Sequence, residues 1–407
     1  MWKRTLGADE NIASGGRVMK ILLVRTIAIE ENLGTATYNN QGIGLATALS
    51  ELGHECGLVY FAKKGNHRTE TMLSDGYKLT VYHIEGKNLV WNALYNKELF
   101  DICKEYDVIQ TSECDQICSW QIYKRFPEKT VIYHGPYRSK YTKKYNIRSR
   151  FFDLVFTWRN GFRDARVITK SKLAEDYLRA KGFRNIVTLG VGLNPYMLNR
   201  EIEHVPEKLE KVIHEKGKQK YLLYVGAISQ RKNTMFLLRV LKTLVKNMGY
   251  DEYRLLIIGD KAYKEEWYFN HCFSYIDEQS LQDNVIYLGK IEQKYLRLLY
   301  PLCDIYLLAT QYDIFGMVYL EAMYFGVTIL TTSCGGSSLL IQEGVTGYIL
   351  DSQNADEWAE KAEEIIENEE KNKLMHDNAQ KLIRDNYLWA KLVPRFLEVY
   401  RGLLTDG

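Results

Sequence analysis

Short apolar runs alternate with amphipathic helical patterns along almost the whole chain, and this alternation restricts the fold more than any other feature. The run KILLV (20–24), for example, is followed by GLATALSELGH (44–54), in which apolar residues recur at helical spacing. A parallel sheet requires this order, because a helix must carry the chain back to the start of the next strand. The rhythm restarts at YLLYVG (221–226), after a polar stretch from 192 to 220. We therefore expect an α/β fold with two doubly wound, Rossmann-like domains.

The runs that we interpret as strands fall into two sets. The first set comprises 20–24, 57–61, 107–111, 130–134, 165–169 and 185–190. The second set comprises 221–226, 254–259, 284–289, 304–310, 327–332 and 347–350. Because ligands of such folds bind beyond the carboxyl ends of the strands, we expect a binding cleft between the two domains.

The predicted domain boundaries follow from these sets. Residues 19–200 form the first domain and residues 201–385 the second. Residues 1–18 are polar and lack the apolar core of a signal peptide, so we interpret them as a disordered extension or an expression remnant. We expect residues 386–407 to form a terminal helix that packs back on the first domain. Its apolar stripe comprises Leu392, Phe396, Val399 and Leu403.

Composition excludes several classes of protein. With 407 residues, of which 46% are hydrophobic and 26% charged, the chain is long enough for two cores. It has no uninterrupted apolar run long enough to span a bilayer, so we expect no transmembrane helix. Seven cysteines, an odd number, lie mostly within apolar segments and indicate reduced thiols in the cytoplasm. The pair Cys114 and Cys118 has no further ligands nearby, so we expect no metal site.

The segment from 311 to 350 is the most informative for function. A strand is expected to end near Thr310, and Phe315-Gly316 then opens a helix whose free N–H groups would attract an anion such as phosphate. Asp313 before this helix and Glu321 within it should lie about 10 Å apart, a separation that suits two hydroxyl-bearing ends of one extended ligand. Alternatively, Asp313 only caps the helix and Glu321 is solvated.

This segment resembles the E-x7-E signature of family four of the glycosyltransferases, and here it reads Asp313-x7-Glu321. Further similarity lies in GLATALSELGHE (44–55), YHGP (133–136), YVGAISQRKN (224–233) and LYPLCDIYLLAT (299–310). The resemblance implies a GT-B fold and a retaining glycosyltransferase. In such an enzyme the second domain binds a nucleoside-diphosphate sugar and the first binds a glycan or lipid-linked acceptor. It implies neither a cofactor nor a metal, and it favours a role in surface polysaccharide or glycoconjugate biosynthesis.

The resemblance also implies roles for individual residues. Glu321 would bind the donor ribose, and Asp313 the hydroxyls of the donor sugar. Arg231 and Lys232, after Gly226, would neutralise the diphosphate, although two adjacent cations are equally typical of a solvated turn. The backbone segment that would contact the donor near its phosphates comprises Phe315, Gly316 and Met317.

In the first domain the resemblance implies two further contacts. His134 ends a predicted strand and would lie beside the donor sugar, and the alternative is a histidine satisfied within the core. Gly34 follows the first strand and would let backbone amides approach the diphosphate. The catalytic set is therefore His134, Arg231, Lys232 and Asp313.

Two departures from the family pattern weaken the identification of the donor. The first acidic residue is Asp313 where the family has Glu, and Ala227 stands where Arg commonly follows the glycine. Two other functions therefore stay open. One is a sugar-nucleotide 2-epimerase of similar fold, and the other is a non-catalytic binding or scaffold protein.

The stretch from 137 to 163 holds eight Lys or Arg residues, one Asp and eight aromatic residues. It is interpreted either as helices packing on their own sheet or as a surface that rests on anionic lipid at the inner face of the membrane. Nucleic acid is not expected as a partner, because no nucleic-acid module accompanies the patch. Charge also differs between the halves, at +10 for residues 1–200 and −7 for 201–407. The halves are therefore expected to face different partners.

Overall fold

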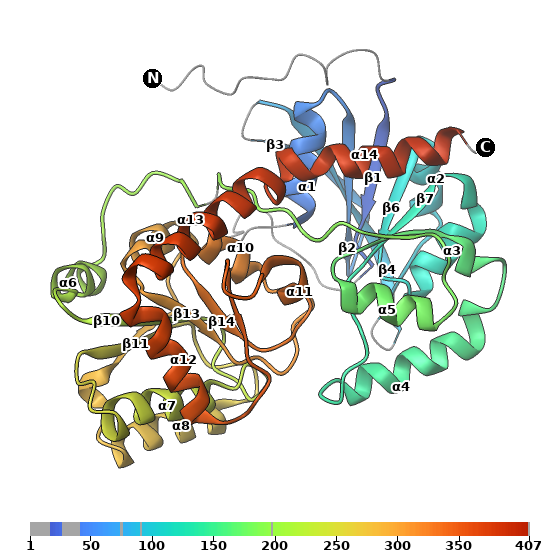
Figure 1. Cartoon of the computed structure of the whole chain (residues 1–407). Helices are drawn as coiled ribbons and strands as arrows, with labels where there is room; N and C mark the ends of the chain where they lie inside the picture. Colours follow the sequence, from blue (N-terminus) through green and yellow to red (C-terminus); the bar gives the residue numbers. More distant parts are fainter. Residues whose placement is uncertain (1–16, 27–40, 74–75, 90–91, 197, 406–407) are drawn as a thin grey trace.

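The computed structural model describes residues 17–26, 41–73, 76–89, 92–196 and 198–405. Two lobes, each built on one sheet and flanked by helices, make up the molecule (Figure 1). Most of the predicted extension, residues 1–16, lies outside the described residues. Within the described part of the chain, no helix is both long and apolar enough to span a bilayer.

The first sheet has the order β3-β4-β2-β1-β6-β7-β8-β9, with β5 paired to β4. All neighbours are parallel except the pairs β3–β4 and β4–β5. Its strands are β1 (Lys20–Val24), β2 (Glu55–Ala62), β3 (His67–Met72), β4 (Lys78–Leu89), β5 (Asn92–Tyr95), β6 (Val108–Ser112), β7 (Thr130–His134), β8 (Arg166–Thr169) and β9 (Ile186–Thr188).

The second sheet is entirely parallel and has the order β12-β11-β10-β13-β14-β15. Counted along the chain this is 3-2-1-4-5-6, the order of dinucleotide-binding sheets, whose ligands bind where the order reverses. The reversal lies between β10 and β13. The strands are β10 (Lys220–Val225), β11 (Tyr253–Ile258), β12 (Val285–Gly289), β13 (Ile305–Leu308), β14 (Ile329–Thr331) and β15 (Gly347–Ile349).

Helices connect the strands and cover the sheets (Figure 1). In the second domain α7 packs against α8 and α12, and α10 packs against α13. The helices of the first domain are α1 (Gln41–Glu51), α2 (Glu98–Lys104), α3 (Ile117–Arg125), α4 (Lys143–Phe152) and α5 (Lys172–Ala180). Those that follow are α6 (Glu207–Glu215), α7 (Thr234–Lys242), α8 (Glu266–Glu278), α9 (Gln293–Leu299), α10 (Met317–Tyr324), α11 (Ser337–Leu340), α12 (Ala355–Glu367), α13 (Glu369–Asn386) and α14 (Trp389–Thr405).

The predicted α/β class with two doubly wound domains is confirmed, and each predicted apolar run contains a strand. The sequence patterns missed β3, β4 and β5. β3 has the sequence HRTETM and is almost wholly exposed. An edge strand with little apolar surface to bury leaves no apolar run, so the pattern that marks buried parallel strands does not detect it.

The chain passes between the two domains twice, and the two passages are hydrogen-bonded to each other. The N–H of Leu193 donates to the carbonyl oxygen of Tyr387 at 2.7 Å, and the N–H of Trp389 donates to that of Leu193 at 3.1 Å. The second passage leads directly into α14. This pairing fixes where the last helix starts.

α14 then runs along the first domain (Figure 1). Tyr133 of β7 and Phe396 of α14 meet edge to face with ring centroids 5.5 Å apart. The hydroxyl of Tyr400 donates to the side-chain oxygen of Gln110 at 2.7 Å, and both side chains are buried. The final residues of the chain thus complete the core of the domain that begins it.

Trp389 anchors this arrangement. Its side chain is buried, and a Cβ atom on Gly44 of α1 would lie only 2.5 Å from the indole ring. We expect Trp389→Ala to lower the free energy of unfolding by about 3–5 kcal/mol, because it leaves a cavity at the start of α14. The control is Lys391→Ala, an exposed position on the same helix. Chemical denaturation followed by circular dichroism measures both, and equal stability of the two variants would contradict the anchoring role.

Candidate functional site

A cavity of about 580 Å³ opens at the carboxyl edge of the second sheet, beside the point where its strand order reverses. Residues after β10, β11 and β12 form one wall, and α9 and α10 form the other. Three residues singled out from the sequence, Gly226, Met317 and Glu321, line this one space. The remaining lining residues include Ala227, Gly259, Asp260, Lys261, Lys290, Ile291, Gln293, Leu296 and Val318.

Glu321 is the buried ionisable group of this cavity. Its side chain receives hydrogen bonds from Gln293 Nε2, at 2.5 Å, and from the Tyr300 hydroxyl, at 3.2 Å. Burial raises the pKa of Glu321 to about 7, and the two donors only partly oppose this shift. The predicted alternative of a solvated helix residue is therefore wrong. The carboxyl group lies inside the fold and faces the cavity.

Gln293 and Tyr300 were missed from the sequence. Gln293 begins α9, and its Oε1 atom is buried without a hydrogen-bond partner among the described residues. Because its Nε2 atom donates to Glu321, the amide keeps one unsatisfied acceptor next to an acidic group. Gln293 in α9 and Tyr300, directly after that helix, reach Glu321 from positions 28 and 21 residues away. No local sequence signal marks them.

The two charges predicted to bind phosphate and sugar form an ion pair. Lys232 Nζ donates to Asp313 Oδ2, and the Lys232 side chain is mostly buried. Arg231 is more exposed, and its guanidinium donates to the carbonyl oxygen of Tyr312 at 2.7 Å. The loop after β10 is thereby attached to the loop after β13. Both loops leave the sheet at the point where the strand order reverses.

Close backbone contact holds the loop that carries Asp313. The N–H of Gly335 donates to the Asp313 carbonyl, and the N–H of Gly336 donates to the Phe315 carbonyl, both at 3.0 Å. A Cβ atom on Gly335 would lie 1.8 Å from the carbonyl oxygen of Ile314, so a side chain there is excluded. Gly316 follows with a φ of 84° and precedes the first residue of α10. Residues 315–317, which are predicted to contact the phosphates, therefore follow a loop that backbone hydrogen bonds hold in place.

The first domain contacts this loop directly. Tyr137 and Tyr312 pack with ring centroids 4.7 Å apart, and the Tyr137 hydroxyl donates to the Asp313 carbonyl at 3.0 Å. A Cβ atom on Gly135 would lie 2.4 Å from the Ile314 side chain. The carboxyl end of β7 thus meets the carboxyl end of β13, and the two sheets face each other across Asp313.

His134 lies at this junction, but its ring is wholly buried. Nδ1 is 3.1 Å from Glu113 Oε2, and Nε2 has no hydrogen-bond partner among the described residues. The imidazole faces the interior of the first domain, where Glu113 lies, rather than an open cleft. This is the environment of a core histidine. The contact with a donor sugar that the resemblance implies stays a prediction.

Glu113 was missed from the sequence and has an unusual environment. It follows β6 in a left-handed conformation with φ of 66°. Burial alone would raise its pKa, but Lys170 at 3.3 Å, His134 and the Gly135 N–H outweigh burial and lower the pKa to about 2. A strained backbone holding a buried carboxylate is a feature of functional sites. Here the carboxylate fixes the Gly135 loop that touches Ile314.

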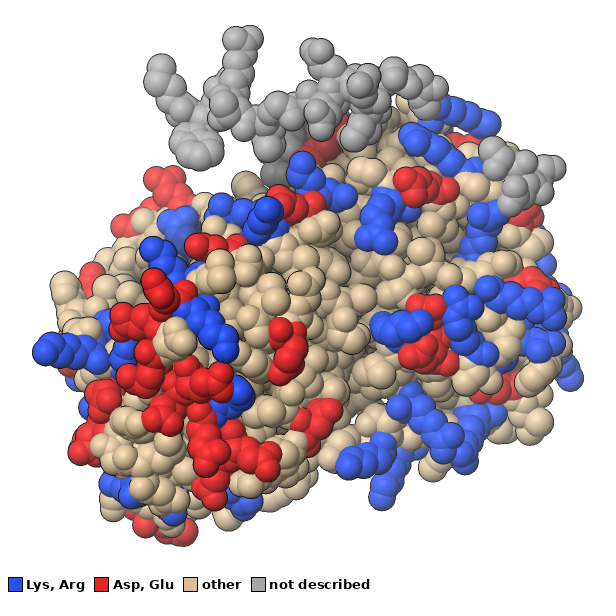
Figure 2. Space-filling view, viewed as in Figure 1, with Lys and Arg blue, Asp and Glu red and all other residues tan. Residues whose placement is uncertain are grey.

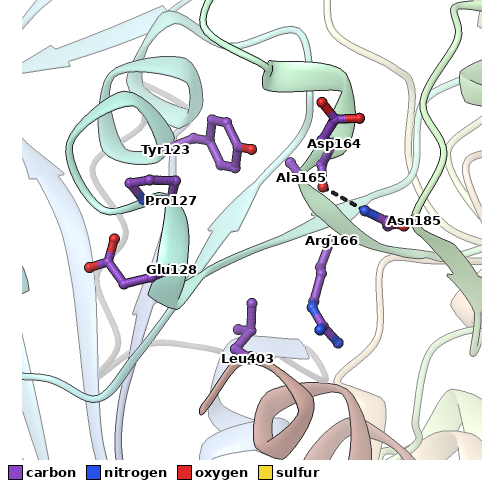
Figure 3. A pocket seen from close by; sticks show the side chains of 8 residues that line it. All are labelled: Tyr123, Pro127, Glu128, Asp164, Ala165, Arg166, Asn185 and Leu403. Carbon is purple, nitrogen blue, oxygen red and sulfur yellow. Dashed lines mark hydrogen bonds between the residues drawn. The ribbon is translucent and has the colours of Figure 1, made fainter. Parts of the chain in front are cut away.

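Other cavities lie away from this junction. One of about 420 Å³ is lined by residues at the opposite, amino-terminal edge of the first sheet, including Lys20, Cys56 and Lys78. A smaller one of about 170 Å³ lies where the end of α14 meets the first domain, near Arg166 and Leu403 (Figure 3). Neither contains a predicted site residue. Gly34, the remaining predicted contact, lies outside the described residues.

Residues 206–382 match the family model described as glycosyl transferases group 1. The match covers the second domain and not the first. The matched segment contains the whole 580 Å³ cavity together with Arg231, Lys232 and Asp313. This match confirms the family-level resemblance over the second domain. The finer predictions, membership of family four and a retaining mechanism, stay predictions.

Curated relatives match part of this chain. Spore coat protein SA of Bacillus subtilis is 25% identical over 54% of the chain and 59% of its own length. N-acetyl-alpha-D-glucosaminyl L-malate synthase of Bacillus anthracis is 26% identical over 46% of the chain and 47% of its own length. The chain therefore spans about half the length of the curated relatives it matches.

Solved structures show the same fold over nearly the whole chain. The Anabaena protein HepE in complex with UDP has a TM-score of 0.71 and 17% identity, covering 94% of this chain and 100% of that one. Sucrose-phosphate synthase of Thermosynechococcus elongatus has a TM-score of 0.70 and 16% identity, with coverage of 95% and 100%. These similarities establish that the chain has the GT-B fold.

Burial of Glu321 predicts a pH-dependent stability. Because its pKa is raised from 4.5 to about 7, the folded state retains a proton that the unfolded chain has lost between those values. This contribution to stability is complete below about pH 4.5 and is lost as the pH rises through 7. The variant Glu321→Gln has no carboxyl group to titrate at this position. The melting temperature of the variant minus that of the unmodified chain should therefore increase by several degrees from pH 5 to pH 8.

The control for this measurement is Glu360→Gln, at an exposed position of α12. Differential scanning calorimetry at several pH values would give the melting temperatures of all three proteins. A constant difference between Glu321→Gln and the unmodified chain across this range would contradict the raised pKa.

Proposed function

We propose that this protein is a retaining, metal-independent glycosyltransferase that moves a sugar from a nucleoside-diphosphate sugar to a glycan or lipid-linked acceptor. The second domain binds the donor and the first binds the acceptor. The proposal places the enzyme in the cytoplasm and its product in surface polysaccharide or glycoconjugate synthesis.

One observation carries this proposal. The cavity at the carboxyl edge of the second sheet holds a buried carboxyl group, Glu321, and is lined by Met317 at the start of α10, four residues after Asp313 of the Lys232–Asp313 pair. A ribose at Glu321, a diphosphate at the start of α10 and a sugar at Asp313 would follow one another from the cavity toward the junction with the first domain. The carboxyl groups accept hydrogen bonds from hydroxyls, and the helix terminus attracts the anion.

In the proposed transfer the protein positions the two substrates and supplies positive charge that stabilises the leaving group. In the proposed step the bond between the anomeric carbon and the diphosphate oxygen breaks, and a bond from that carbon to the acceptor oxygen forms on the same face. The departing diphosphate takes the acceptor proton, so the step requires no protein nucleophile. Lys232, Arg231 and the start of α10 stabilise the negative charge that develops on the leaving group.

Lys232 and Asp313 must change partners in this mechanism. In the structure each satisfies the other. A bound diphosphate offers Lys232 a stronger anion, which would leave the Asp313 carboxylate to accept hydrogen bonds from sugar hydroxyls. Such an exchange keeps two buried charges compensated before and after the donor binds.

We expect a nucleoside diphosphate to raise the melting temperature of the protein, and its base to identify the donor. The complexes of HepE with UDP and with UDP-glucose support testing UDP first, followed by GDP, ADP and dTDP. A ligand at 100 times its dissociation constant adds about 2.7 kcal/mol of stability. Each nucleotide is measured by thermal shift with and without EDTA.

Each part of the proposal is tested by a different outcome of this experiment. A shift that EDTA abolishes would contradict metal independence. No shift with any nucleotide would contradict the donor site. Analysis of the products formed without an acceptor separates transfer from 2-epimerisation, because an epimerase converts the nucleotide sugar alone.

Lys232→Ala should lower turnover about 10²-fold, because the variant loses a cation that stabilises the leaving diphosphate. The control is Arg239→Ala, an exposed cation on α7. Release of the nucleoside diphosphate in the presence of acceptor is the measured rate. Turnover equal to that of the control would remove Lys232 from the proposed mechanism.

A further inference from the structure

The helical segment after Tyr137 has two apolar stripes, of which the fold uses one. α4 (Lys143–Phe152) continues into a π-helical turn, η3 (Asp153–Thr157). Phe152 is buried, and its ring lies 4.9 Å from that of Phe156, which meets Trp120 of α3 at 5.0 Å. These side chains attach the helix to the first domain.

The second stripe faces solvent. It comprises Ile147, Phe151, Leu154 and Trp158, spaced by four, three and four residues, with 70%, 68%, 78% and 62% of each residue exposed. We call it the outer stripe. Four large apolar side chains at helical spacing on one outward face are unlike single exposed residues scattered over a surface. Packing on the domain's own sheet accounts for the inner stripe and leaves the outer stripe unexplained.

Cations surround the outer stripe. Six exposed basic side chains lie in the same segment, and none of them forms an ion pair with another described residue. Figure 2 shows Lys and Arg atoms gathered over α4 at the lower right. Asp153, the one acidic residue of the stretch 137–163, is paired with Lys181 at 2.9 Å. The members of this cationic rim are Arg138, Lys140, Lys143, Lys144, Arg150 and Arg159.

We propose that the outer stripe and the cationic rim dock this protein on an anionic lipid bilayer. Apolar side chains enter the boundary between headgroups and acyl chains, while Lys and Arg contact anionic headgroups. Trp158 is suited to this boundary because its ring is amphipathic, and the Arg163 guanidinium lies 4.0 Å from its centroid.

A second copy of the chain fits this surface less well than a bilayer does. Two copies joined through the same face would bring one cationic rim against the other, which is electrostatically unfavourable. The rim begins at Arg138, directly after Tyr137, whose hydroxyl contacts Asp313. Docking through this segment therefore places the interdomain junction close to the lipid surface. The docking does not depend on the proposed donor, so either proposal can fail without the other.

Vesicle sedimentation tests the proposal with the full chain. We expect binding to vesicles of equal parts phosphatidylcholine and phosphatidylglycerol, weaker binding to phosphatidylcholine alone, and loss of binding at high salt. The triple variant Ile147→Ser, Phe151→Ser, Leu154→Ser should partition about tenfold or more weakly into the anionic vesicles.

The matched control replaces three exposed apolar residues elsewhere, as Met72→Ser, Tyr263→Ser and Leu374→Ser, and should bind like the unmodified chain. Circular dichroism shows whether each variant is folded. A second measurement does not depend on the triple variant. The fluorescence of Trp158 should shift to shorter wavelength on anionic vesicles, and Trp158→Phe should bind but lose that shift.

Three outcomes would overturn the proposal. The first is an unmodified chain that stays in the supernatant with anionic vesicles. The second is equal binding by the triple variant and its control. The third is a concentration-dependent dimer in sedimentation velocity that the triple variant abolishes, because the outer stripe would then be a protein interface.

Discussion

The backbone pairing of Leu193 with Tyr387 and Trp389 is the contact on which the arrangement of the two domains depends. It joins both passages of the chain between the lobes. It also starts α14, whose rings pack into the first domain through Phe396 and Trp389. As a result one hydrophobic core runs through both lobes, and the carboxyl edges of the two sheets are turned toward each other. The candidate site lies at the carboxyl edge of the second sheet, beside this junction.

Burial gives the site its chemistry. Glu321 and Glu113 are both enclosed carboxyl groups, yet their pKa values move in opposite directions. Desolvation dominates at Glu321 and raises its pKa, whereas Lys170, His134 and the Gly135 N–H overcome desolvation at Glu113 and lower its pKa. Glu113 therefore keeps its charge and orders a loop, while Glu321 is poised to gain or lose a proton near neutral pH. Glu113 organises the junction, and Glu321 lines the cavity of the second domain.

The strands that position the site could be predicted because a parallel strand covered on both faces must be apolar throughout, as Ile305–Leu308 is. The positions of Asp313 and Glu321 could also be predicted, because the end of a strand, a glycine and a helix follow one another in this short motif. Gln293, Tyr300 and Glu113 could not be placed. Their positions depend on contacts with residues 21 to 57 positions away, and the left-handed backbone of Glu113 has no local sequence cause. β3 could not be predicted because its residues are exposed and form no apolar run.

The structure shows where the opposite net charges of the two halves of the chain lie on the molecule. Acidic side chains gather over α12 and α13 of the second domain, at the lower left of Figure 2, whereas the cationic rim lies on the first domain. Near an anionic surface the acidic face is repelled and the rim is attracted, and both effects act within about a Debye length. The two charge distributions therefore favour the same orientation, with α4 against the lipid and the second domain turned away. Apolar contact by the outer stripe supplies short-range attachment, and the net charges of +10 and −7 on the two halves determine which side of the molecule approaches.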